Sequence, residues 1–336
     1  MKKVLITGAG SYVGESVKAY IKTHAADKIE IEAVDTFGDN WKKADFSQYD
    51  VVYHVAGIAE VNGKKDMEQL YYKVNTDLTI EIAEHAKLAG VTQFIFMSSM
   101  IVYKETQSLE GNVVGPDTKP EPNGVYGDSK LKAEIGLKKV CTDGQMKLVI
   151  LRPPMIYGPN SKSNLLRLGR LGTKLPIFPS WKNKRSMLFI DNLSEFVKEV
   201  ILREKEGTFY PQNKELSSTV DIIRFFAKRY NHSIWITRLL NPCVWLGSYV
   251  LQPVNKMFAD SYYIPCSSTF VLYSHWSDIP LLQRLSHILV TSLAYFGIKK
   301  VCYCIVIIVT HFFISLFYFP VTVTASSSSS IQFILP

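Results

Sequence analysis

Cysteine is scarce in this sequence, and its placement excludes the common structural uses of the residue. None of the five cysteines forms a Cys-x-x-Cys pair, and the Cys302-x-Cys304 spacing is too short for zinc and falls in an apolar run. We therefore expect reduced thiols in a cytoplasmic protein and no metal site.

A concentrated positive charge is also missing. The formal net charge is +8, but the Lys and Arg residues are scattered and form no dense basic run with interleaved aromatic residues. Nucleic-acid binding needs such a run, so we expect no nucleic-acid partner, and a nucleotide or phosphate ligand explains the charge balance. We expect no signal peptide either, since the apolar run in MKKVLITGAG ends after three residues and favours a β-strand.

Charged residues almost disappear after residue 260. Only four of them lie in residues 261–336, and none follows Lys300. The apolar stretch 301–323 is long enough to span a bilayer, whereas Pro320 and many β-branched residues disfavour such a helix. Three interpretations stay open: a membrane segment that anchors a cytoplasmic domain, a buried element of a cytoplasmic protein, and a C-terminus that is not native.

The first 260 residues alternate between strand-like and helix-like patterns. Apolar or alternating runs that predict β-strands occupy residues 2–7, 29–35, 50–57 and 93–99, and amphipathic runs that predict helices occupy residues 15–23 and 76–89. Alternating strands and helices predict parallel strands, right-handed crossovers and helices on both faces. The expected fold class is therefore α/β, a Rossmann-type doubly wound parallel sheet.

The composition divides the chain into three expected parts. Residues 1–160 would form the nucleotide-binding Rossmann domain, with strands of its sheet returning later in the chain, and residues 161–260 would form a small substrate-binding lobe. Residues 261–336 form the charge-poor apolar tail. If that tail is not native, the lobe is incomplete, and activity could be lost while cofactor binding survives.

A glycine-rich turn joins the first expected strand to the first helix. In TGAGSYVG, residues 7–14, Gly8 permits a tight turn, the small residues 9–11 let backbone amides approach a pyrophosphate, and Gly14 lets the helix pack on the strand. The helix N-terminus adds positive potential at the diphosphate. Strand, turn and helix together predict a dinucleotide site.

A carboxylate at the end of the second strand selects the form of the dinucleotide. Asp35 lies about twenty residues beyond the glycines, where it can accept hydrogen bonds from both adenosine ribose hydroxyls and repel a 2′-phosphate. This predicts NAD rather than NADP, and the alternative is a cap for the turn at DTFGD. The small residues of HVAG, residues 54–57, would let the dinucleotide lie against the backbone, while we expect His54 to be a structural residue of the core.

Together with motifs further along the chain, these residues resemble a known family. The series combines Thr7-Gly8 and Gly14 with Asp35, Asp45, Ala56-Gly57, Asn75, Ser98-Ser99, Tyr126 and Lys130, followed by LRPPMIYGP at residues 151–159. It is similar to the extended short-chain dehydrogenase/reductase family, and within it to the NAD-dependent nucleotide-sugar epimerase/dehydratase group, over residues 1–260. Ser11 departs from the family pattern, which has glycine there, but a serine is small enough for the close approach.

The resemblance implies a cofactor, a substrate and a partner. These are bound NAD, a nucleotide sugar that we expect to carry UDP, and a second copy of the chain in a homodimer. The residues that it implies for NAD binding are Gly8, Gly10, Ser11, Tyr12, Val13, Gly14, Asp35, Asp45, Phe46, Val55, Ala56, Gly57, Asn75, Ser98, Tyr126, Lys130 and Pro153.

The resemblance also implies a catalytic set of Ser99, Tyr126 and Lys130. A free phenol with a pKa of about 10 is a weak base at neutral pH, so nearby positive charge must lower that pKa. The i, i+4 spacing places Tyr126 and Lys130 on one helix face, and Lys130 can also hold the nicotinamide ribose. Tyr126 would remove a proton from a sugar hydroxyl while Ser99 hydrogen-bonds the oxygen that becomes a ketone.

The residues after Ser99 separate the branches of the family. Sugar 4,6-dehydratases carry an acidic pair there, whereas this chain has Met100 and Ile101, which cannot transfer protons. The leading expectation is therefore a UDP-sugar 4-epimerase, similar to UDP-glucose 4-epimerase, that serves polysaccharide assembly. An NAD-dependent nucleotide-sugar reductase or dehydrogenase stays as one alternative, and a catalytically idle NAD-binding scaffold with a membrane tail as another.

The resemblance implies substrate contacts at Ser99, Asn164, Leu165 and Arg185. The last three match positions that hold the nucleotide diphosphate of the sugar donor, and an arginine fork suits paired phosphate oxygens. A helix cap at Asn164 and a solvated loop at residues 182–185 are the other interpretations.

Overall fold

A six-stranded parallel sheet forms the centre of the fold. The computed structural model describes residues 1–58, 68–104, 108–161 and 164–264. The sheet has the spatial order β10-β6-β4-β3-β1-β2, and every pair of neighbours is parallel. Its strands are β1 (Lys2–Thr7), β2 (Ile29–Val34), β3 (Val51–His54), β4 (Gln93–Met97), β6 (Lys147–Leu151) and β10 (Gly207–Phe209).

The strand order reverses next to β1. The chain passes from β1 to its neighbour β2 and then crosses back to place β3 on the other side of β1. Open α/β sheets bind ligands at such a reversal, in the crevice outside the carboxyl ends of the strands. At that edge Val55 N and Ala56 N both donate to Thr7 O at 3.0 Å, so the turn after β1 and the loop after β3 lie against each other.

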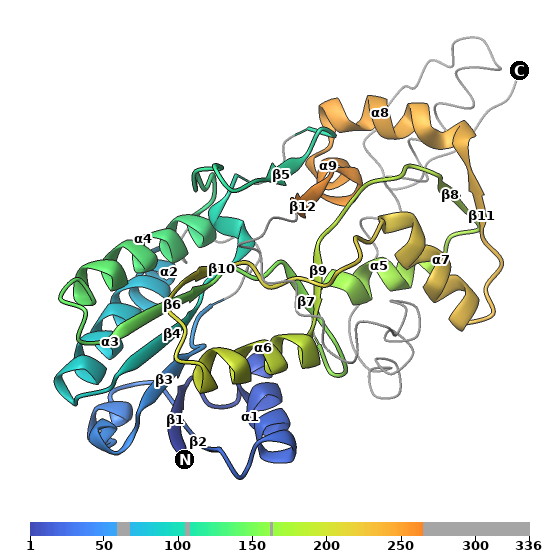
Figure 1. Cartoon of the computed structure of the whole chain (residues 1–336). Coiled ribbons are helices and arrows are strands. Elements are labelled where there is room, and N and C mark those ends of the chain that lie inside the picture. Colours follow the sequence, from blue (N-terminus) through green and yellow to red (C-terminus); the bar gives the residue numbers. More distant parts are fainter. Residues whose placement is uncertain (59–67, 105–107, 162–163, 265–336) are drawn as a thin grey trace, which may run out of the picture. The chain divides into compact units, whose positions relative to one another are not determined.

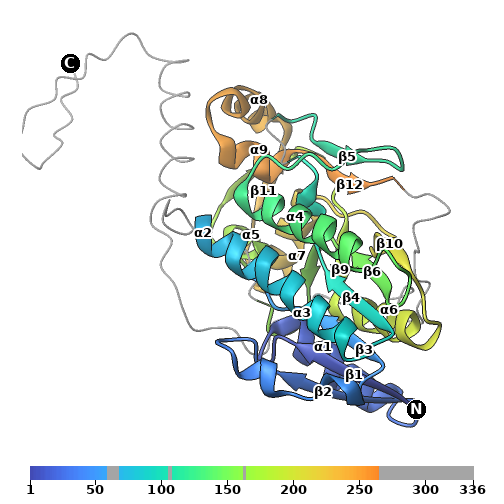
Figure 2. The same ribbon diagram turned by 90° about the vertical axis from the view of Figure 1, so that its left-hand side faces the viewer.

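Helices cover both faces of the sheet (Figure 1, Figure 2). They are α1 (Tyr12–His24), α3 (Leu78–Leu88), α4 (Val125–Val140) and α6 (Ile190–Leu202). On one face α1 and α6 pack on Val4, Ile6 and Tyr53, and on the other α3 and α4 pack on Leu5 and Val52. The period-two alternation of each strand thus supplies both cores, and the predicted doubly wound α/β fold is confirmed.

The remaining elements are short strands and helices. The short strands form three two-stranded parallel pairs, β11 with β8, β12 with β5, and β7 with β9. The strands are β5 (Asn112–Val114), β7 (Met155–Tyr157), β8 (Ile177–Pro179), β9 (Met187–Phe189), β11 (Trp235–Thr237) and β12 (Ser261–Tyr263). The helices are α5 (Asn164–Gly172), α7 (Thr219–Arg229), η6 (Arg238–Leu240), α8 (Asn241–Val250) and α9 (Gln252–Phe258).

Two helices begin earlier than the sequence pattern predicts. The first helix begins at Tyr12, because Ser11 Oγ caps it by accepting a hydrogen bond from Gly14 N at 3.2 Å. The helix predicted to begin at Thr76 is preceded by α2 (Glu68–Tyr71) and a π-helical turn, η4 (Tyr72–Asp77), which leads directly into α3. These starts depend on capping and tertiary contacts, which the amphipathic pattern does not contain.

The interpretations of the apolar tail 301–323 concern residues outside the described ranges, and so do those of Cys302 and Cys304. Within the described ranges, no helix is both long and apolar enough to cross a membrane. Cys141 and Cys243 are free thiols, and Cys266 lies outside the described ranges.

Two glycines let α5 and α7 approach closely. A Cβ atom at Gly169 would lie 2.4 Å from the ring of Phe226, and one at Gly172 would lie 2.6 Å from Ile223 O. A backbone oxygen inside a helix cannot swing aside as a side chain can. Of these two glycines, Gly172 is therefore the one where an added methyl group would be accommodated less easily.

We expect Gly172→Ala to lower the free energy of unfolding by about 1–2 kcal/mol, because overpacking a rigid backbone contact outweighs the gain in helix propensity. Urea titration followed by far-UV circular dichroism measures the change. Gly247→Ala is the matched control in α8, where the new Cβ would lie 3.4 Å from Val254 Cγ2 and fits. A loss of the same size in both variants would contradict the explanation.

Candidate active site

The turn after β1 has the geometry of a dinucleotide-binding loop. Gly8 has a φ of +116°, and its N–H donates to Val34 O at 3.0 Å. A Cβ atom at Gly8 would lie 2.7 Å from Ala56 N, so a glycine is needed where the two strand ends meet. The loop leads into the N-terminus of α1, whose N–H groups and dipole favour a diphosphate.

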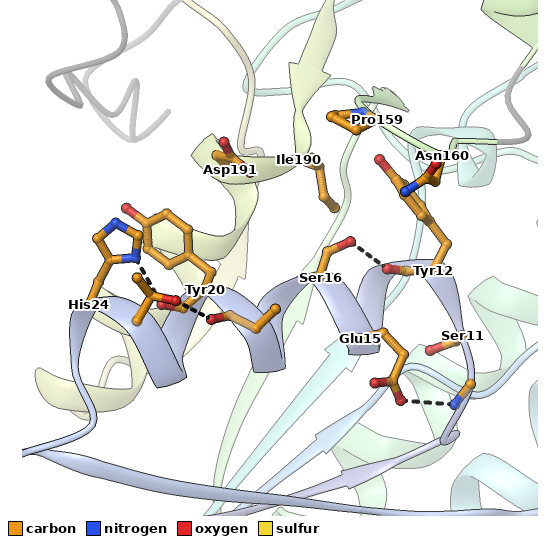
Figure 3. A pocket seen from close by; sticks show the side chains of 13 residues that line it. Ser11, Tyr12, Glu15, Ser16, Tyr20, His24, Pro159, Asn160, Ile190 and Asp191 are labelled. Carbon is orange, nitrogen blue, oxygen red and sulfur yellow. Dashed lines mark hydrogen bonds between the residues drawn. The ribbon is translucent and has the colours of Figure 1, made fainter. Parts of the chain in front are cut away.

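A groove of about 550 Å³ borders this loop and runs along α1 (Figure 3). Glu15 lines the groove, and its Oε1 accepts a hydrogen bond from Gly10 N at 3.1 Å. Asp191, at the start of α6, lines the groove as well, and burial raises the pKa of its carboxyl. No motif pointed to Glu15, although its position in the first turn of α1 is suited to a contact with the loop before the helix.

Asp35 directly follows β2 and is exposed. Its Oδ1 accepts a hydrogen bond from Phe37 N at 2.9 Å, so it caps the turn that follows. Because Thr7 pairs with Val34 across the parallel strands, Asp35 and Gly8 lie at the same edge of the sheet. The position suits both roles considered for Asp35, the turn cap and the ribose contact.

Asp45 and Phe46 lie at a short helical turn, η2 (Phe46–Gln48), after η1 (Asn40–Lys43). Asp45 accepts hydrogen bonds from Ser47 Oγ at 2.6 Å and from Gln48 Nε2 at 3.0 Å, and these bonds lower the pKa of its carboxyl. Phe46 is buried and packs on Trp41. A cofactor contact by Phe46 would therefore come from its backbone.

Asn75 fixes the loop after β3. Its side chain is buried, with Oδ1 accepting from Ile58 N at 2.8 Å and Nδ2 donating to Ile58 O at 3.1 Å. Nδ2 also donates to Ser129 Oγ on α4 at 3.1 Å. The π-helical turn that contains Asn75 is thus bonded both to the loop with Val55, Ala56 and Gly57 and to the helix that carries Tyr126.

Lys130 extends from α4 to the ends of β3 and β4. Its buried ammonium group donates to Met97 O at 3.0 Å and lies 4.8 Å from the centroid of the Phe96 ring. A Cβ atom at Gly57 would lie 3.0 Å from Lys130 Nζ, so the lysine reaches the loop after β3. Burial lowers the pKa of Lys130 to about 8, and the charge of Glu134 acts in the opposite direction.

Tyr126 lies in the first turn of α4, as predicted, and precedes Lys130 by one turn. Its ring centroid is 6.1 Å from that of Tyr71. A Cβ atom at Gly127 would lie 2.5 Å from Ile101 O, so this glycine lets the start of α4 approach the turn η5 (Met100–Val102). The approach brings Tyr126 to the segment that follows Ser99.

The two serines after β4 have different partners. Ser99 is the N-cap of η5, and its Oγ accepts a hydrogen bond from Ile101 N at 3.3 Å. Ser98 is buried and donates to Glu134. Since Met100 N donates to Pro153 O at 2.9 Å, the structure brings the ends of β4 and β6 and the start of α4 together.

Sequence reasoning missed a buried ion pair at this point, formed by Glu134 and Arg152. Arg152 Nε donates to Glu134 Oε1 at 3.0 Å, and Nη2 donates to Oε2. A signal for the pair was present in the sequence. Glu134 follows Lys130 by four residues and so lies on the same face of the helix, and Arg152 belongs to LRPPMIYGP.

His54 has a structural role, as expected. Its ring is buried, with Nδ1 2.8 Å from Thr7 Oγ1 and Nε2 3.0 Å from Thr79 Oγ1. Burial, and to a smaller extent the charge of Lys130, lowers the pKa of His54 to about 3. The ring is therefore neutral at physiological pH and does not serve as a proton carrier.

Three of the four residues implied for substrate binding lie after β7 in the chain. Leu165 is buried, and Asn164 is the first residue of α5, with a side chain outside the described part of the structure. Arg185 exchanges backbone hydrogen bonds with Ser217 at 2.8 and 2.9 Å, and its guanidinium group donates to Lys256 O. Burial lowers the pKa of Arg185 to about 10, so the side chain carries its charge at neutral pH.

Comparisons with known proteins agree with this geometry. Residues 4–210 match the NAD dependent epimerase/dehydratase family. The chain is 33% identical over 261 residues to a UDP-glucose 4-epimerase from Vibrio cholerae. The matched region covers 70% of this chain and 77% of that protein. It is 25% identical over 277 residues to an N-acetyl-alpha-D-glucosaminyl-diphospho-ditrans,octacis-undecaprenol 4-epimerase from Escherichia coli O157:H7, which covers 77% and 82%.

A solved structure shares the fold. It is the UDP-glucuronic acid 4-epimerase from Bacillus cereus in complex with NAD, with a TM-score of 0.58 and 23% identity. The similarity covers 70% of this chain and 85% of that chain. At this level of identity the likeness concerns the architecture, a parallel sheet with helices on both faces.

The glycine turn yields a prediction with a control in the same loop. We expect Gly8→Ala to weaken NADH binding at least about tenfold, because a left-handed φ strains alanine by about 1–3 kcal/mol and the new methyl group displaces Ala56. Fluorescence titration with NADH measures the affinity. Gly10→Ala adds backbone strain at a φ of +77°, but no atom lies within 4 Å of the new Cβ. The loss of NADH affinity should therefore be smaller in Gly10→Ala than in Gly8→Ala. A larger loss in Gly10→Ala would refute the close approach as the cause.

Proposed function

The chain belongs to the NAD-dependent epimerase/dehydratase family, and we propose that it is a UDP-sugar 4-epimerase. It is an NAD-dependent enzyme of the extended short-chain dehydrogenase/reductase type. The observation that supports the proposal is the close approach of the start of α4, which carries Tyr126, to the turn that follows Ser99. Lys130 of the same helix donates to Met97 O at the end of β4, and Met100 and Ile101 stand in place of acidic residues.

The residues at the carboxyl ends of β1, β2 and β3, where the strand order reverses, fit NAD. Gly8 has no side chain and lies against Ala56, so the backbone there would be accessible to a dinucleotide. The N-terminus of α1 would bind the diphosphate. Asp35, which is exposed after β2, would bind the adenosine ribose. When bound, NAD would supply reversible hydride transfer at C4 of the sugar. The protein supplies the proton transfers and holds the sugar for both directions.

Each of the three polar residues has a separate task in this proposal. Tyr126 removes the proton of the C4 hydroxyl and returns it after the sugar has turned. The buried ammonium group of Lys130, one turn away on the same face, stabilises the phenolate form of Tyr126. Ser99 donates a hydrogen bond to the C4 oxygen as it becomes a carbonyl oxygen.

The residues next to Ser99 favour epimerisation over dehydration. Eliminating water requires an acid and a base beside the sugar, and Met100 and Ile101 offer neither. Met100 is buried in a cluster with Val102 and Tyr103. The runner-up is a nucleotide-sugar reductase or dehydrogenase, and the two sequence relatives described above, both 4-epimerases by name, weigh against it.

Arg185 supports a substrate whose sugar is attached to a diphosphate. Its Nε atom is buried and has no hydrogen-bond partner among the described residues, while its guanidinium group is charged. An unpaired N–H of a charged fork is suited to a phosphate oxygen. Both sequence relatives carry a diphosphate sugar in their names, in agreement with this use of Arg185.

We expect Tyr126→Phe to lower kcat with UDP-galactose or UDP-N-acetylgalactosamine by about 10²–10⁴-fold, because the proton acceptor is lost, while NAD binding is kept. A coupled assay of the epimerised product measures turnover, and absorbance at 340 nm measures any net NADH. Tyr72→Phe is the control: Tyr72 donates to Asp128 at the helix surface, and its loss should leave turnover unchanged.

Two results would overturn the proposal. The first is turnover by Tyr126→Phe at the wild-type level, which would leave an NAD-binding scaffold without this chemistry. The second is steady net formation or consumption of NADH by the wild-type protein, since an epimerase regenerates its cofactor in each cycle. The second result would favour the reductase or dehydrogenase alternative.

A further inference from the structure

Glu134 connects three segments of the proposed active site, which are helix α4 and the ends of β4 and β6. Its carboxylate is bound by Arg152, which follows β6, and by Ser98, which follows β4. Glu134 itself lies on α4, two turns after Tyr126 and one turn after Lys130. The side chains of Glu134 and Arg152 are 1% and 6% exposed, so water does not weaken their interaction.

The neighbours of this pair are the proposed catalytic and cofactor-binding residues. Ser99 follows Ser98 directly, and Pro153 follows Arg152 directly and accepts a hydrogen bond from Met100 N. Each segment is therefore held one residue away from the position that acts on the ligand. A displacement of the carboxylate would move all of these segments relative to one another.

Arg152 extends the same network to Tyr103 and to β12. Its Nη1 donates to Tyr103 Oη at 2.7 Å, and its carbonyl oxygen accepts from Tyr263 Oη on β12 at 2.8 Å. The Tyr210 ring lies 5.9 Å from the guanidinium carbon. The three guanidinium nitrogens of Arg152 and the two carboxylate oxygens of Glu134 thus all have hydrogen-bond partners.

Stability alone does not explain a buried ion pair. Desolvating two charges costs about as much as their attraction returns, and apolar residues of the same shape are often equally stable. The pair at Glu134 has, however, an electrostatic neighbour that needs it. Lys130 is a buried cation on the same helix face, and Glu134 is the charge that opposes the lowering of its pKa by burial.

The other groups that face Lys130 do not replace this charge. His54 on β3 is neutral, and Met97 O at the end of β4 is a dipole without net charge. Tyr126 on α4 is a neutral phenol for part of the proposed cycle. Arg152, which follows β6, is a cation and cannot stabilise a second one.

We propose that Glu134 is a positioning residue of the reaction, which holds Ser99, Pro153 and Tyr126 in register and lies one turn from Lys130 on the same helix face. Its negative charge also favours the protonated form of Lys130. The proposal rests on the proposed function, because Lys130 must be charged to stabilise the Tyr126 phenolate. Glu134 touches neither the sugar nor the cofactor in this role. It acts through Lys130 by its charge and through Ser98 and Arg152 by hydrogen bonds.

The test is the dependence of kcat/KM on pH in Glu134→Gln. In the wild-type enzyme activity should fall as the pH rises through the pKa of Lys130, near 8. Without the carboxylate, Lys130 loses its proton at lower pH. The alkaline limb of the pH profile of kcat/KM should therefore shift to a pH about one unit lower. Glu134→Asp keeps the charge but shortens the side chain, so we expect a lower kcat with an unmoved alkaline limb.

Asp128→Asn is the matched control. Asp128 is also an acidic residue of α4 that binds a tyrosine and a cation, Tyr72 and Lys132, but at the surface. Removing its charge should leave the alkaline limb where it is. A folded Glu134→Gln variant with a wild-type pH profile would overturn the proposal, and so would an equal shift in Asp128→Asn.

A second measurement needs no turnover and separates this inference from the proposed function. The attraction between Glu134 and Lys130 exists only while Lys130 is protonated, so the gap in unfolding free energy between wild type and Glu134→Gln should narrow as the pH rises above about 7 and through 8. A pKa shift of one unit corresponds to a narrowing of about 1.4 kcal/mol. A constant gap between pH 6 and 9 would disprove the coupling even if the protein shows no epimerase activity.

A fallback variant covers the case in which an unpaired Arg152 prevents folding. Glu134→Gln with Arg152→Met removes both charges, and such replacements are often neutral for stability. Lys130 loses its counter-charge and also the repulsion of the Arg152 cation, so the alkaline limb should move in the same direction as in the single variant but by less. An unmoved limb in the folded double variant would refute the role assigned to Glu134.

Discussion

The burial of one ammonium group governs the arrangement of this site. A charge in the interior is costly unless it is paired or hydrogen-bonded, and Lys130 meets that cost with partners from several elements. Met97 O and the Phe96 ring come from β4, and the counter-charge comes from Glu134 on α4 itself. If helix α4 moved along the sheet, the ammonium group of Lys130 would lose its hydrogen bond to Met97 O. This restriction fixes the position of Tyr126, which lies on the same helix.

The sheet topology determines what this fixed helix faces. Because the strand order reverses between β1 and β3, the glycine turn and the loop after His54 meet at the same edge at which β4 and β6 end. In the proposed site, a dinucleotide bound at the reversal would extend toward Lys130 and Ser99. The course of the backbone therefore brings the segments proposed for cofactor binding and for proton transfer to one edge of the sheet.

Local patterns predicted the features that are local. The strand at residues 2–7, the turn at residues 7–14 and the spacing of Tyr126 and Lys130 each lie within a few residues of sequence, and the structure places all three as expected. Asp35 was also placed correctly at the end of its strand. The fold class followed because alternating strands and helices have few ways to pack.

The features that escaped prediction depend on contacts between distant segments. Glu134 and Arg152 are 18 positions apart, and neither residue shows by itself that the other will neutralise it. The burial of the Phe46 ring depends on Trp41 and on the helices above it. The functional roles assigned to the implied site residues were taken from the family resemblance, which a pattern of apolar residues cannot supply.

The π-helical turn at residues 72–77 has a consequence for how this chain is related to others. A π-helix holds more residues in a turn than an α-helix does, so η4 accommodates additional chain length between α2 and α3. Its hydrogen bonds from Asn75 and Thr76 to Ser129 fix where that length is absorbed. A relative with an uninterrupted helix here would match α3 in register but not α2, so the gap in their alignment belongs inside the turn and not in the loop before it.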